Sequence, residues 1–578
     1  MSNPSRTVWS GTRQLSVLTG PLLSLSLALG LQITGWAQTA PDAGSLLQQL
    51  ERERRPALPP KALPARPAEP AAMQPLQGAS VTVSSFRFVG NTLLSDGQLA
   101  PAVAEYLNRP LDFSQLQAAS AAVAEIYRAA GWIVRAYLPQ QDIVDGVVTI
   151  QIVEAVFGGV KLEGAPATRV SLSQIQRGID AQQAVGAPLN ADAIDRALLL
   201  ADDLPGVAVS GSLREGTQAS QTELVIKLAD EPLLMGEATL DNTGSRSTGA
   251  NRLSANLSLN SAMGMGDLLS ANLIHAQGSD YLRLGGTLPV GAQGWRIGAN
   301  ASNMRYRLIT EEFAALDSKG TSSTAGLEAS YPLIRSRLQN LYFNASLDRK
   351  SFDNQANGVT STNYQANSLS LSLSGNFFDK LGGGGANSAS LALSSGQLDL
   401  SGSPNQAADA ASSQTDGSYR KLRYSASRQQ VITDEISFYA ALSGQWASKN
   451  LDSSEKFYLG GSSGVRAYPS SEAGGAAGQL LNLELRWRLP EGFNLTGFFD
   501  AGQVTVNANN SFTGAAALND YSLKGAGLTL AWQGNSGLNL KATLARRIGD
   551  NPNPTATGND QDGSLVKNRF WLTASLPF

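Results

Sequence analysis

The chain has 578 residues, a length that predicts more than one domain. Only 16% of the residues are charged and the net charge is -3, so the composition gives no basic footprint for nucleic acid. The chain has no cysteine, which excludes disulfides and thiolate metal sites. Glycine is abundant, at 58 residues, and a charge-poor, glycine-rich chain with many strand-like segments is typical of a membrane β-barrel.

The first 37 residues have the pattern of an export signal. Arg6 and Arg13 precede an apolar run from Leu15 to Ile33, and Gly35-Trp36-Ala37 has the small-x-small form of a cleavage site. This pattern predicts a signal peptide over residues 1–37. The alternative is a membrane anchor, which the cleavage pattern and the Ser, Thr and Gly residues within the run disfavour.

Residues 42–55 predict a short amphipathic helix, with Asp42 or Ser45 as its cap. Its narrow apolar edge consists of Leu46, Leu47 and Leu50. Residues 56–80 are rich in proline and predict a semi-rigid, extended linker. Because the helix has so little apolar surface, we expect it not to fold with a neighbour's core. Two interpretations stay open: it docks in a polar cavity, or it is a frayed tail.

Residues 81–231 contain a diverged repeat of one small domain. The first copy, residues 81–155, predicts the element order β-α-α-β-β, and the second copy, residues 156–231, predicts the same order. Pro110-Leu111 of the first copy recurs as Pro188-Leu189, 78 residues later. The sequence therefore predicts two α+β domains in tandem.

Each repeat is predicted to hold a three-stranded sheet with helices on one face. Such a sheet leaves an edge strand that can accept an extended peptide through main-chain hydrogen bonds. The alternative is a pair of spacer domains without a ligand. The sequence has no paired acids in a pocket-like setting and no nucleophile with a base, so we expect no enzyme, no cofactor and no metal site. The one histidine, His275, has no partner of its kind.

From residue 233 to residue 578, apolar and polar residues alternate repeatedly, as between Ser368 and Phe377. One apolar and one polar face per strand fits lipid outside and water inside. A soluble β-sandwich is disfavoured because the polar faces carry Arg and Glu in mid-strand. At roughly 20 residues per strand with its turn, the segment holds about 16 strands. The predicted fold is mostly β, an antiparallel transmembrane barrel that follows a helix and two α+β domains.

The end of the chain and three long segments indicate how such a barrel is oriented. The last strand alternates up to Phe578 at the C-terminus, which resembles the signal that outer-membrane assembly machinery reads. Long Gly/Ser/Asn/Asp segments near residues 400–418, 507–520 and 550–564 are predicted to be loops on the outer side.

Six short motifs follow one another along the mature chain. They are Tyr106-Leu107-Asn108-Arg109-Pro110-Leu111, Gly131-Trp132, Asp145-Gly146-Val147-Val148, Asp241-Asn242-Thr243-Gly244, Val465-Arg466-Ala467-Tyr468 and Phe499-Asp500-Ala501-Gly502. With these motifs in this order, the chain resembles the outer-membrane transporters of two-partner secretion, the haemolysin and filamentous-haemagglutinin exporters. These are relatives of the barrel-assembly insertases, which also carry POTRA domains.

The resemblance implies a location and a set of partners. The location is the Gram-negative outer membrane, with both POTRA domains in the periplasm. The partners are a secreted exoprotein with an amino-terminal secretion domain, outer-membrane lipid, periplasmic chaperones and the barrel-assembly machinery, and they include no nucleic acid. The motif from Tyr106 to Leu111, with Gly131, is expected to bind the exoprotein. The helix over residues 42–55 is expected to plug the lumen.

The resemblance also implies a latch inside the barrel, where a loop folds back and Arg466 pairs with Asp500 on the inner wall. The remaining predicted latch residues are Val465, Tyr468, Phe499 and Gly502. Ala467 departs from the family motif, which has glycine there. If that position needs positive φ, alanine costs roughly 1 kcal/mol.

Two other functions fit the same layout. A barrel-assembly insertase would fold membrane proteins instead of exporting one, and a passive porin would carry the periplasmic domains without using them. The proline-rich linker after a plug-like helix, and the pair of POTRA units, favour the exporter.

Overall fold

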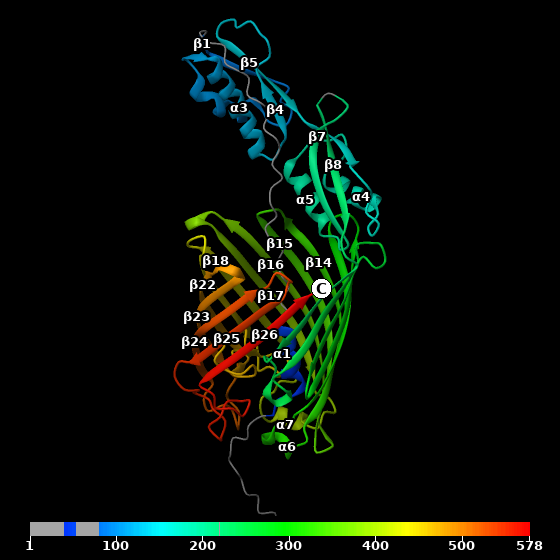
Figure 1. Cartoon of the computed structure of the whole chain (residues 1–578), viewed down its shortest axis with the longest axis vertical. Coiled ribbons are helices and arrows are strands. Elements are labelled where there is room, and N and C mark those ends of the chain that lie inside the picture. The colour runs from blue at the N-terminus through cyan, green and yellow to red at the C-terminus, as the bar shows by residue number, and fades with distance from the viewer. Residues whose placement is uncertain (1–39, 54–79, 219) are drawn as a thin grey trace, which may run out of the picture. The chain divides into compact units, whose positions relative to one another are not determined.

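The computed structural model describes residues 40–53, 80–218 and 220–578 (Figure 1). The predicted signal peptide and nearly all of the predicted linker lie outside the described residues. Within these ranges, no helix is long and apolar enough to cross a membrane.

The first repeat folds as predicted, in the order β-α-α-β-β, around one apolar core. Two helices, α2 (Asp96–Val103) and α3 (Phe113–Ala129), accompany a sheet in which β2 (Ser85–Val89) pairs parallel and β4 (Val134–Tyr137) antiparallel with the central β5 (Val147–Glu154). Its buried residues include Leu99, Val123, Tyr127 and Ile150. This copy also has a feature that was not predicted, a small sheet of β1 (Ser80–Thr82) and β3 (Pro110–Asp112).

The second repeat has the same order and sheet topology. It consists of β6 (Val156–Leu162), α4 (Leu172–Gln182), α5 (Ala191–Asp202), β7 (Val207–Glu215) and β8 (Gln221–Asp230), with β8 in the centre of the sheet.

The two copies share one side-chain interaction. Glu154 accepts hydrogen bonds from the backbone N–H and hydroxyl of Thr92, and Asp230 does the same for Thr168, 76 residues later in both cases. These bonds hold the pKa of both carboxyls below their usual values, although burial opposes the shift in Glu154.

Main-chain bonds join the two repeats directly. The N–H of Ile133 donates to the carbonyl of Leu189 (3.1 Å), Leu189 donates to Ala155 (2.7 Å), and Ala155 donates back to Ile133 (3.0 Å). Gly131 lies in this joint with φ of +82°, and a Cβ there would approach Asn190 Nδ2 to 3.0 Å. Gly131 is therefore buried between the domains, which corrects the expectation that it belongs to an exoprotein-binding surface.

The second half of the chain forms a closed antiparallel barrel of sixteen strands, which confirms the predicted fold class (Figure 1). The strands are β9 (Leu234–Asp241), β10 (Arg252–Asn260), β11 (Leu268–Ala276), β12 (Ser279–Val290), β13 (Trp295–Arg307), β14 (Lys319–Arg335), β15 (Gln339–Ala356), β16 (Val359–Asp379), β17 (Gly385–Asp399), β18 (Gly417–Val431), β19 (Ile436–Ala447), β22 (Ala477–Arg488), β23 (Phe493–Thr505), β24 (Asp520–Gln533), β25 (Asn539–Arg547) and β26 (Asn568–Pro577). Alternation along each strand places leucines such as Leu369 and Leu371 on the exposed outer face and serines on the inner face.

The two ends of the barrel differ in loop length. The predicted long loops occupy residues 400–416, 506–519 and 548–567, and strand alternation puts them at the end opposite to Phe578. The connection over residues 448–476, which contains β20 (Phe457–Tyr458) and β21 (Gly474–Gly475), starts from that same end.

The barrel closes between its first and last strands. β26 pairs with β9 from Thr573↔Asp241 to Pro577↔Glu237, and Phe578 exchanges two backbone hydrogen bonds of 2.9 Å with Gly236. Beyond this ladder the side chain of Asn242 acts in place of a peptide group: its Oδ1 accepts from Leu572 N–H (2.7 Å) and its Nδ2 donates to the Phe570 carbonyl (3.0 Å). The targeting role of Phe578 stays a prediction.

Helix α1 (Ala43–Glu53) lies inside the barrel, against β13, β14 and β15 (Figure 1). Asp42 caps it, because its Oδ1 accepts from Ser45 N–H at 2.8 Å. Its apolar face packs in a buried cluster with barrel residues that include Tyr281, Met304, Phe352 and Tyr364. The expectation that this helix has too little apolar surface to join a neighbour's core is therefore wrong: the barrel supplies the aromatic surface that the helix lacks.

Candidate functional site in the barrel lumen

Residues 459–473, the Arg466 loop, form a tightly folded element inside the barrel. Val465 N–H donates to the Leu459 carbonyl at 2.8 Å, and Tyr468 N–H donates to the Val465 carbonyl at 3.0 Å. A Cβ on Gly464 would lie 2.0 Å from the carbonyl oxygen of Leu459, and one on Gly460 would lie 1.9 Å from that of Pro469. Only glycine fits either position, so these two glycines allow close backbone packing, while Gly461 between them has φ of +103°.

Arg466 and Asp500 form the predicted pair. The guanidinium donates through Nε to Asp500 Oδ2 (2.9 Å) and through Nη2 to Oδ1 (2.7 Å), and the Arg466 backbone N–H also reaches Oδ2 (3.1 Å). Asn482 donates a fourth bond, at 2.7 Å, to Oδ1. Asp500 is fully buried. A bidentate arginine–carboxylate pair is among the stronger polar contacts in proteins, and burial here shields it from water.

Two partners of Arg466 were not predicted. Glu484 on β22 accepts from Arg466 Nη1 at 2.9 Å, and the guanidinium lies 3.6 Å from the ring centre of Phe498. Strand alternation places Phe499 on the opposite, outer face, so the expected latch residue Phe499 is replaced by its neighbour Phe498. The sequence could have identified Phe498, because residues two apart in a strand share a face and Phe498 precedes Asp500 by two positions.

The remaining predicted latch residues pack around the loop. Val465 and Tyr468 are fully buried. Gly502 leaves space for Leu459, since a Cβ there would meet Leu459 Cδ2 at 2.6 Å. Ala467 does not have positive φ, so the expected backbone penalty does not arise. Its methyl group faces Gly525, where a Cβ would come within 2.7 Å of it.

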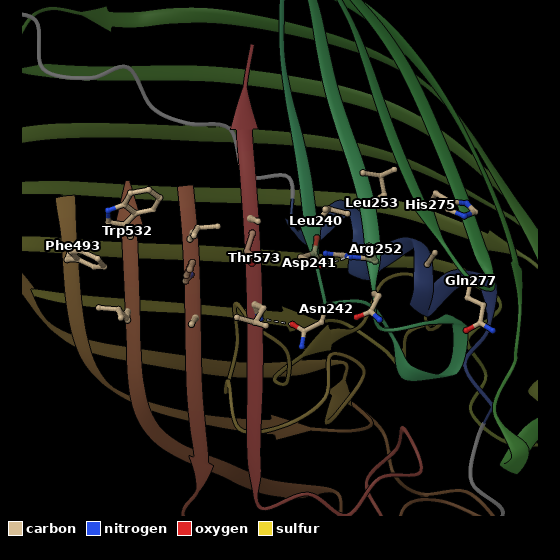
Figure 2. A pocket seen from close by; sticks show the side chains of 18 residues that line it. Leu240, Asp241, Asn242, Arg252, Leu253, His275, Gln277, Phe493, Trp532 and Thr573 are labelled. Atoms are coloured by element: carbon tan, nitrogen blue, oxygen red, sulfur yellow. Dashed lines mark hydrogen bonds and ion pairs between the residues drawn. The ribbon is translucent and has the colours of Figure 1, made fainter. Parts of the chain in front are cut away.

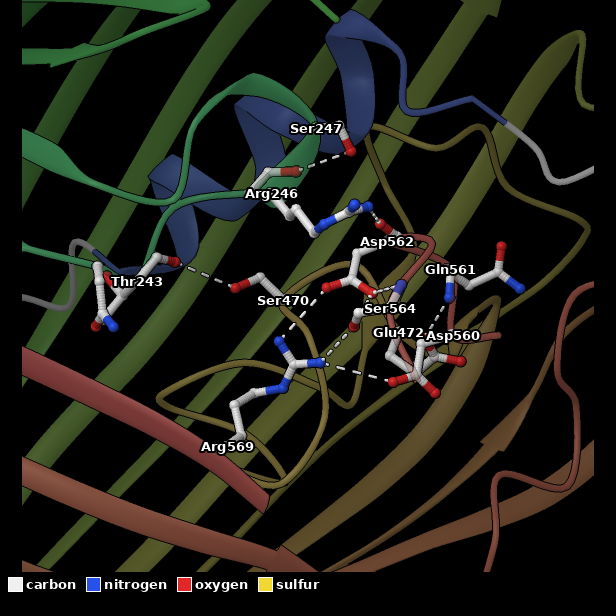
Figure 3. Close-up of polar contacts among 12 residues, drawn as sticks. Thr243, Arg246, Ser247, Ser470, Glu472, Asp560, Gln561, Asp562, Ser564 and Arg569 are labelled. Carbon is white, nitrogen blue, oxygen red and sulfur yellow. Dashed lines mark hydrogen bonds and ion pairs between the residues drawn. The ribbon is translucent and has the colours of Figure 1, made fainter. Parts of the chain in front are cut away.

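Near its base, the Arg466 loop contacts the loop over residues 548–567 through Glu472 and Gln561 (Figure 3). Trp571 on β26 donates to the Arg466 carbonyl at 2.8 Å. Glu472 accepts from Asn551 Nδ2 and from Gln561 N–H, both at 2.8 Å, in the loop over residues 548–567. Burial, with Asp560 nearby, raises the pKa of Glu472 to about 7. Among the described residues, no group of His, Cys, Asp and Glu side chains is arranged to hold a metal ion.

Helix α1 touches the connection between β19 and β22 at both of its ends. Ser453 Oγ donates to the Asp42 carboxylate at 2.7 Å, and a Cβ on Gly44 would lie 2.5 Å from that hydroxyl oxygen. Near the other end, Gln48 donates to the Lys456 carbonyl (2.5 Å) and Arg52 donates to the Tyr458 carbonyl (2.6 Å). The three predicted plug leucines are all buried: Leu46, Leu47 and Leu50.

The predicted exoprotein-binding motif of the first repeat forms the turn between α2 and α3. Asn108 adopts φ of +59° and donates its N–H to the Val83 carbonyl at 2.7 Å. Arg109 lies 5.3 Å from the ring centre of Tyr106. Leu111 is fully buried and Leu107 is half-buried, whereas Asn108, Arg109 and Pro110 are exposed. The exposed part of the motif is the part that is available to a partner.

A pocket of about 1110 Å³ crosses the closure between β26 and β9 (Figure 2). Its apolar lining comes from outward-facing side chains such as Leu240, Leu253 and Leu572, all of them exposed. These side chains belong to the lipid-facing surface of the barrel, and at the closure the pocket reaches the buried pair of Arg252 and Asp241.

Comparisons with known proteins agree with this architecture. The family model described as haemolysin secretion/activation protein ShlB/FhaC/HecB matches residues 220–532, and that of the ShlB-type POTRA domain matches residues 81–155. The heme/hemopexin transporter protein HuxB of Haemophilus influenzae is 26% identical over 565 residues, covering 95% of this chain and 97% of that protein. The outer membrane transporter CdiB of Dickeya dadantii is 27% identical over 424 residues, covering 72% of this chain and 73% of that protein.

A solved structure has the same fold. CdiB from Escherichia coli superposes with a TM-score of 0.71 at 21% identity, covering 94% of this chain and all of that one. Members of the matched family are transporters, and the barrel with its preceding POTRA domains places this chain in the outer membrane. The chain therefore belongs to the haemolysin secretion/activation family ShlB/FhaC/HecB, the outer-membrane transporters that export a partner exoprotein in two-partner secretion.

Proposed function

We propose that export proceeds through the barrel lumen and that two elements control it, α1 as a removable plug and the Arg466 loop as a fixed part of the pore. The exoprotein reaches the periplasm unfolded, and its secretion domain binds the POTRA domains. Helix α1 then leaves the lumen and the chain passes outward. Periplasmic chaperones and the barrel-assembly machinery insert the barrel into lipid, so depletion of that machinery should leave the chain uninserted.

The buried pair of Arg466 and Asp500 supports this proposal most directly. A loop that fills a pore is costly to keep in place unless strong contacts hold it. Here one guanidinium bonds two carboxylates, and one of these, Asp500, is inaccessible to water. Removing one partner of such a pair leaves an uncompensated charge, at a cost of about 3–5 kcal/mol.

Arg466→Ala tests the latch. We expect export to fall below about a tenth of wild type, because a loss of that size displaces the loop from its docked position. Barrel insertion should be unchanged, as measured by heat-modifiable migration on gels. Arg305→Ala is the matched control, since Arg305 is an exposed arginine that alternation places on the outer face of β13. Wild-type export by Arg466→Ala would contradict the latch.

The turn after α2 tests recognition by the first POTRA domain. Arg109→Glu should weaken capture of the exoprotein's secretion domain in a pull-down by about ten-fold, because Arg109 is exposed in the predicted binding motif. Arg177→Glu, at an exposed arginine of α4 in the second domain, is the control. Equal capture by both variants would move recognition away from this turn.

A further inference from the structure

A cavity of about 890 Å³ lies in the lumen beside α1. The strands contribute three cations to its lining, Lys350 on β15 and Lys421 and Arg423 on β18. The connection between β19 and β22 contributes one carboxylate, Glu455. The only other carboxylate in this lining is Glu51, and it belongs to α1.

The geometry assigns Glu51 to Lys350. Lys350 Nζ lies 3.2 Å from Glu51 Oε2 and 3.5 Å from Glu455 Oε1, while Lys421 pairs with Glu455. The side chains of Lys350 and Lys421 are only 13% and 8% exposed. The carboxylate nearest to the largely buried Lys350 is thus that of Glu51, which α1 carries. Helix α1 is the element that is proposed to leave the lumen.

We propose that Lys350, Lys421 and Arg423 form a carboxylate-binding site on the lumen wall. Glu51 occupies it in the closed pore, and aspartate or glutamate side chains of the exported chain occupy it in the open pore. This inference rests on the proposed function, because the site becomes available only when α1 leaves.

The rest of the cavity wall supports an acidic stretch of polypeptide as the occupant. Six small hydroxyl side chains from four neighbouring strands line it: Ser374, Ser388, Ser390, Ser425, Ser427 and Ser443. Two cross-strand pairs bond each other, Ser388 with Ser427 and Ser390 with Ser425, both at 2.7 Å. Among the described residues that line the cavity, the strands contribute no charge other than these three cations.

The site gives the exported chain a way to favour its own passage. When Glu51 leaves, Lys350 loses its nearest carboxylate, and a poorly compensated buried cation is unfavourable. An acidic side chain that takes the place of Glu51 removes that penalty. The exchange makes release of α1 easier when an acidic segment is present than when the lumen is empty.

Ion selectivity of the full-length protein in planar bilayers provides the first test. Open-state currents in a KCl gradient should favour chloride over potassium, and Lys350→Gln and Lys421→Gln should each lower that permeability ratio by about two-fold. Lys350→Arg should keep the wild-type ratio. Lys524→Gln removes a lysine from the exposed outer face of β24 and should change nothing. An unchanged ratio in both lumen variants would overturn the site.

A peptide experiment identifies the occupant. In full-length Glu51→Gln, hexaglutamate added on the periplasmic side should shorten the openings, and adding Lys350→Gln should raise the half-blocking concentration about ten-fold. Hexalysine should not block. Equal block by acetate at the same carboxylate concentration would show a site for small anions and would overturn the exported chain as its occupant.

The two hypotheses fail separately. If Arg466→Ala abolishes export while Lys350→Gln and Lys421→Gln leave selectivity and peptide block as in wild type, the carboxylate site is wrong and the proposed function stands. If Arg466→Ala exports normally, the latch is wrong, whereas the selectivity measurements still decide the site.

Discussion

The two elements that fill the lumen are held by different kinds of contact. The Arg466 loop is joined to the barrel at both ends and buries a guanidinium between Asp500 and Glu484. Helix α1 buries four apolar residues, Ala43, Leu46, Leu47 and Leu50, and its polar bonds go mostly to the connection between β19 and β22. The loop therefore depends on the wall, and the helix depends on both the wall and the loop.

This difference indicates which element can move. Each buried leucine stabilises the docked helix by about 1.5–3 kcal/mol, and an amphipathic helix can recover much of that on another apolar surface. Arg466 has no such substitute, because moving it leaves Asp500 buried and unpaired. Releasing α1 leaves every contact of Arg466 with Asp500 intact, whereas displacing the loop removes a carbonyl acceptor of α1 at Gly460.

Charge reversal at the latch should have the largest effect. Asp500→Arg should abolish export and also release α1, seen as more frequent channel openings, because both elements lose their anchor. Arg466→Asp combined with Asp500→Arg should restore more export than either single change. A double variant no better than the single ones would mean that the pair does not act through its opposite charges.

A change in α1 should have an intermediate effect and should spare the loop. Leu47 is 1% exposed in an aromatic cluster, so Leu47→Asp should undock the helix and raise open probability several-fold while export continues. Gln49→Asp adds the same charge at a half-buried position and is the control. Loss of export in Leu47→Asp, with the barrel inserted, would contradict the independence of the loop.

The smallest expected effect is a dependence on pH at the base of the Arg466 loop. Burial raises the pKa of Glu472 to about 7, above its ordinary value, so the docked state holds a proton that the undocked state has released near neutral pH. Docking of residues 548–567 is therefore strongest in acid and weakens as pH rises through 7. Hydrogen exchange of this loop, corrected for intrinsic rates, should show less protection at pH 8 than at pH 6.

Glu472→Gln keeps a hydrogen-bonding side chain that cannot ionise. It should therefore keep the protection of the loop over residues 548–567 equal at the two pH values. A wild-type protein with no difference between pH 6 and pH 8 would mean that Glu472 does not control this contact.

Much of the fold could be read from periodicity. Alternation with period two marks the barrel strands because each strand has one lipid face and one lumen face, and it gave the strand number. The repeat extends to a matching interaction at an offset of 76 residues, Glu154 with Thr92 and Asp230 with Thr168. The pairing of Arg466 with Asp500 followed from the resemblance of the two motifs that carry them to those of the family.

The errors come from contacts between segments that are far apart in the chain. Helix α1 looked too polar to join a core, because the aromatic surface it packs on is contributed by residues 281–400, more than two hundred positions away. Gly131 was assigned to a binding surface, although it is buried against Asn190 of the next domain. The residues adjacent in sequence to α1 or to Gly131 do not indicate which distant segments pack against them.

The sequence by itself determined the barrel, the tandem domains and the charges of the latch, because each follows from local periodicity or from the residue type at one position. Only the tertiary structure decided what surrounds Arg466. It placed Phe498 under the guanidinium and Glu484 beside it, and it removed the expected cost of Ala467 by giving that residue ordinary φ. It also brought Glu51 to Lys350, a pair separated by 299 residues that exists only because the barrel encloses the helix.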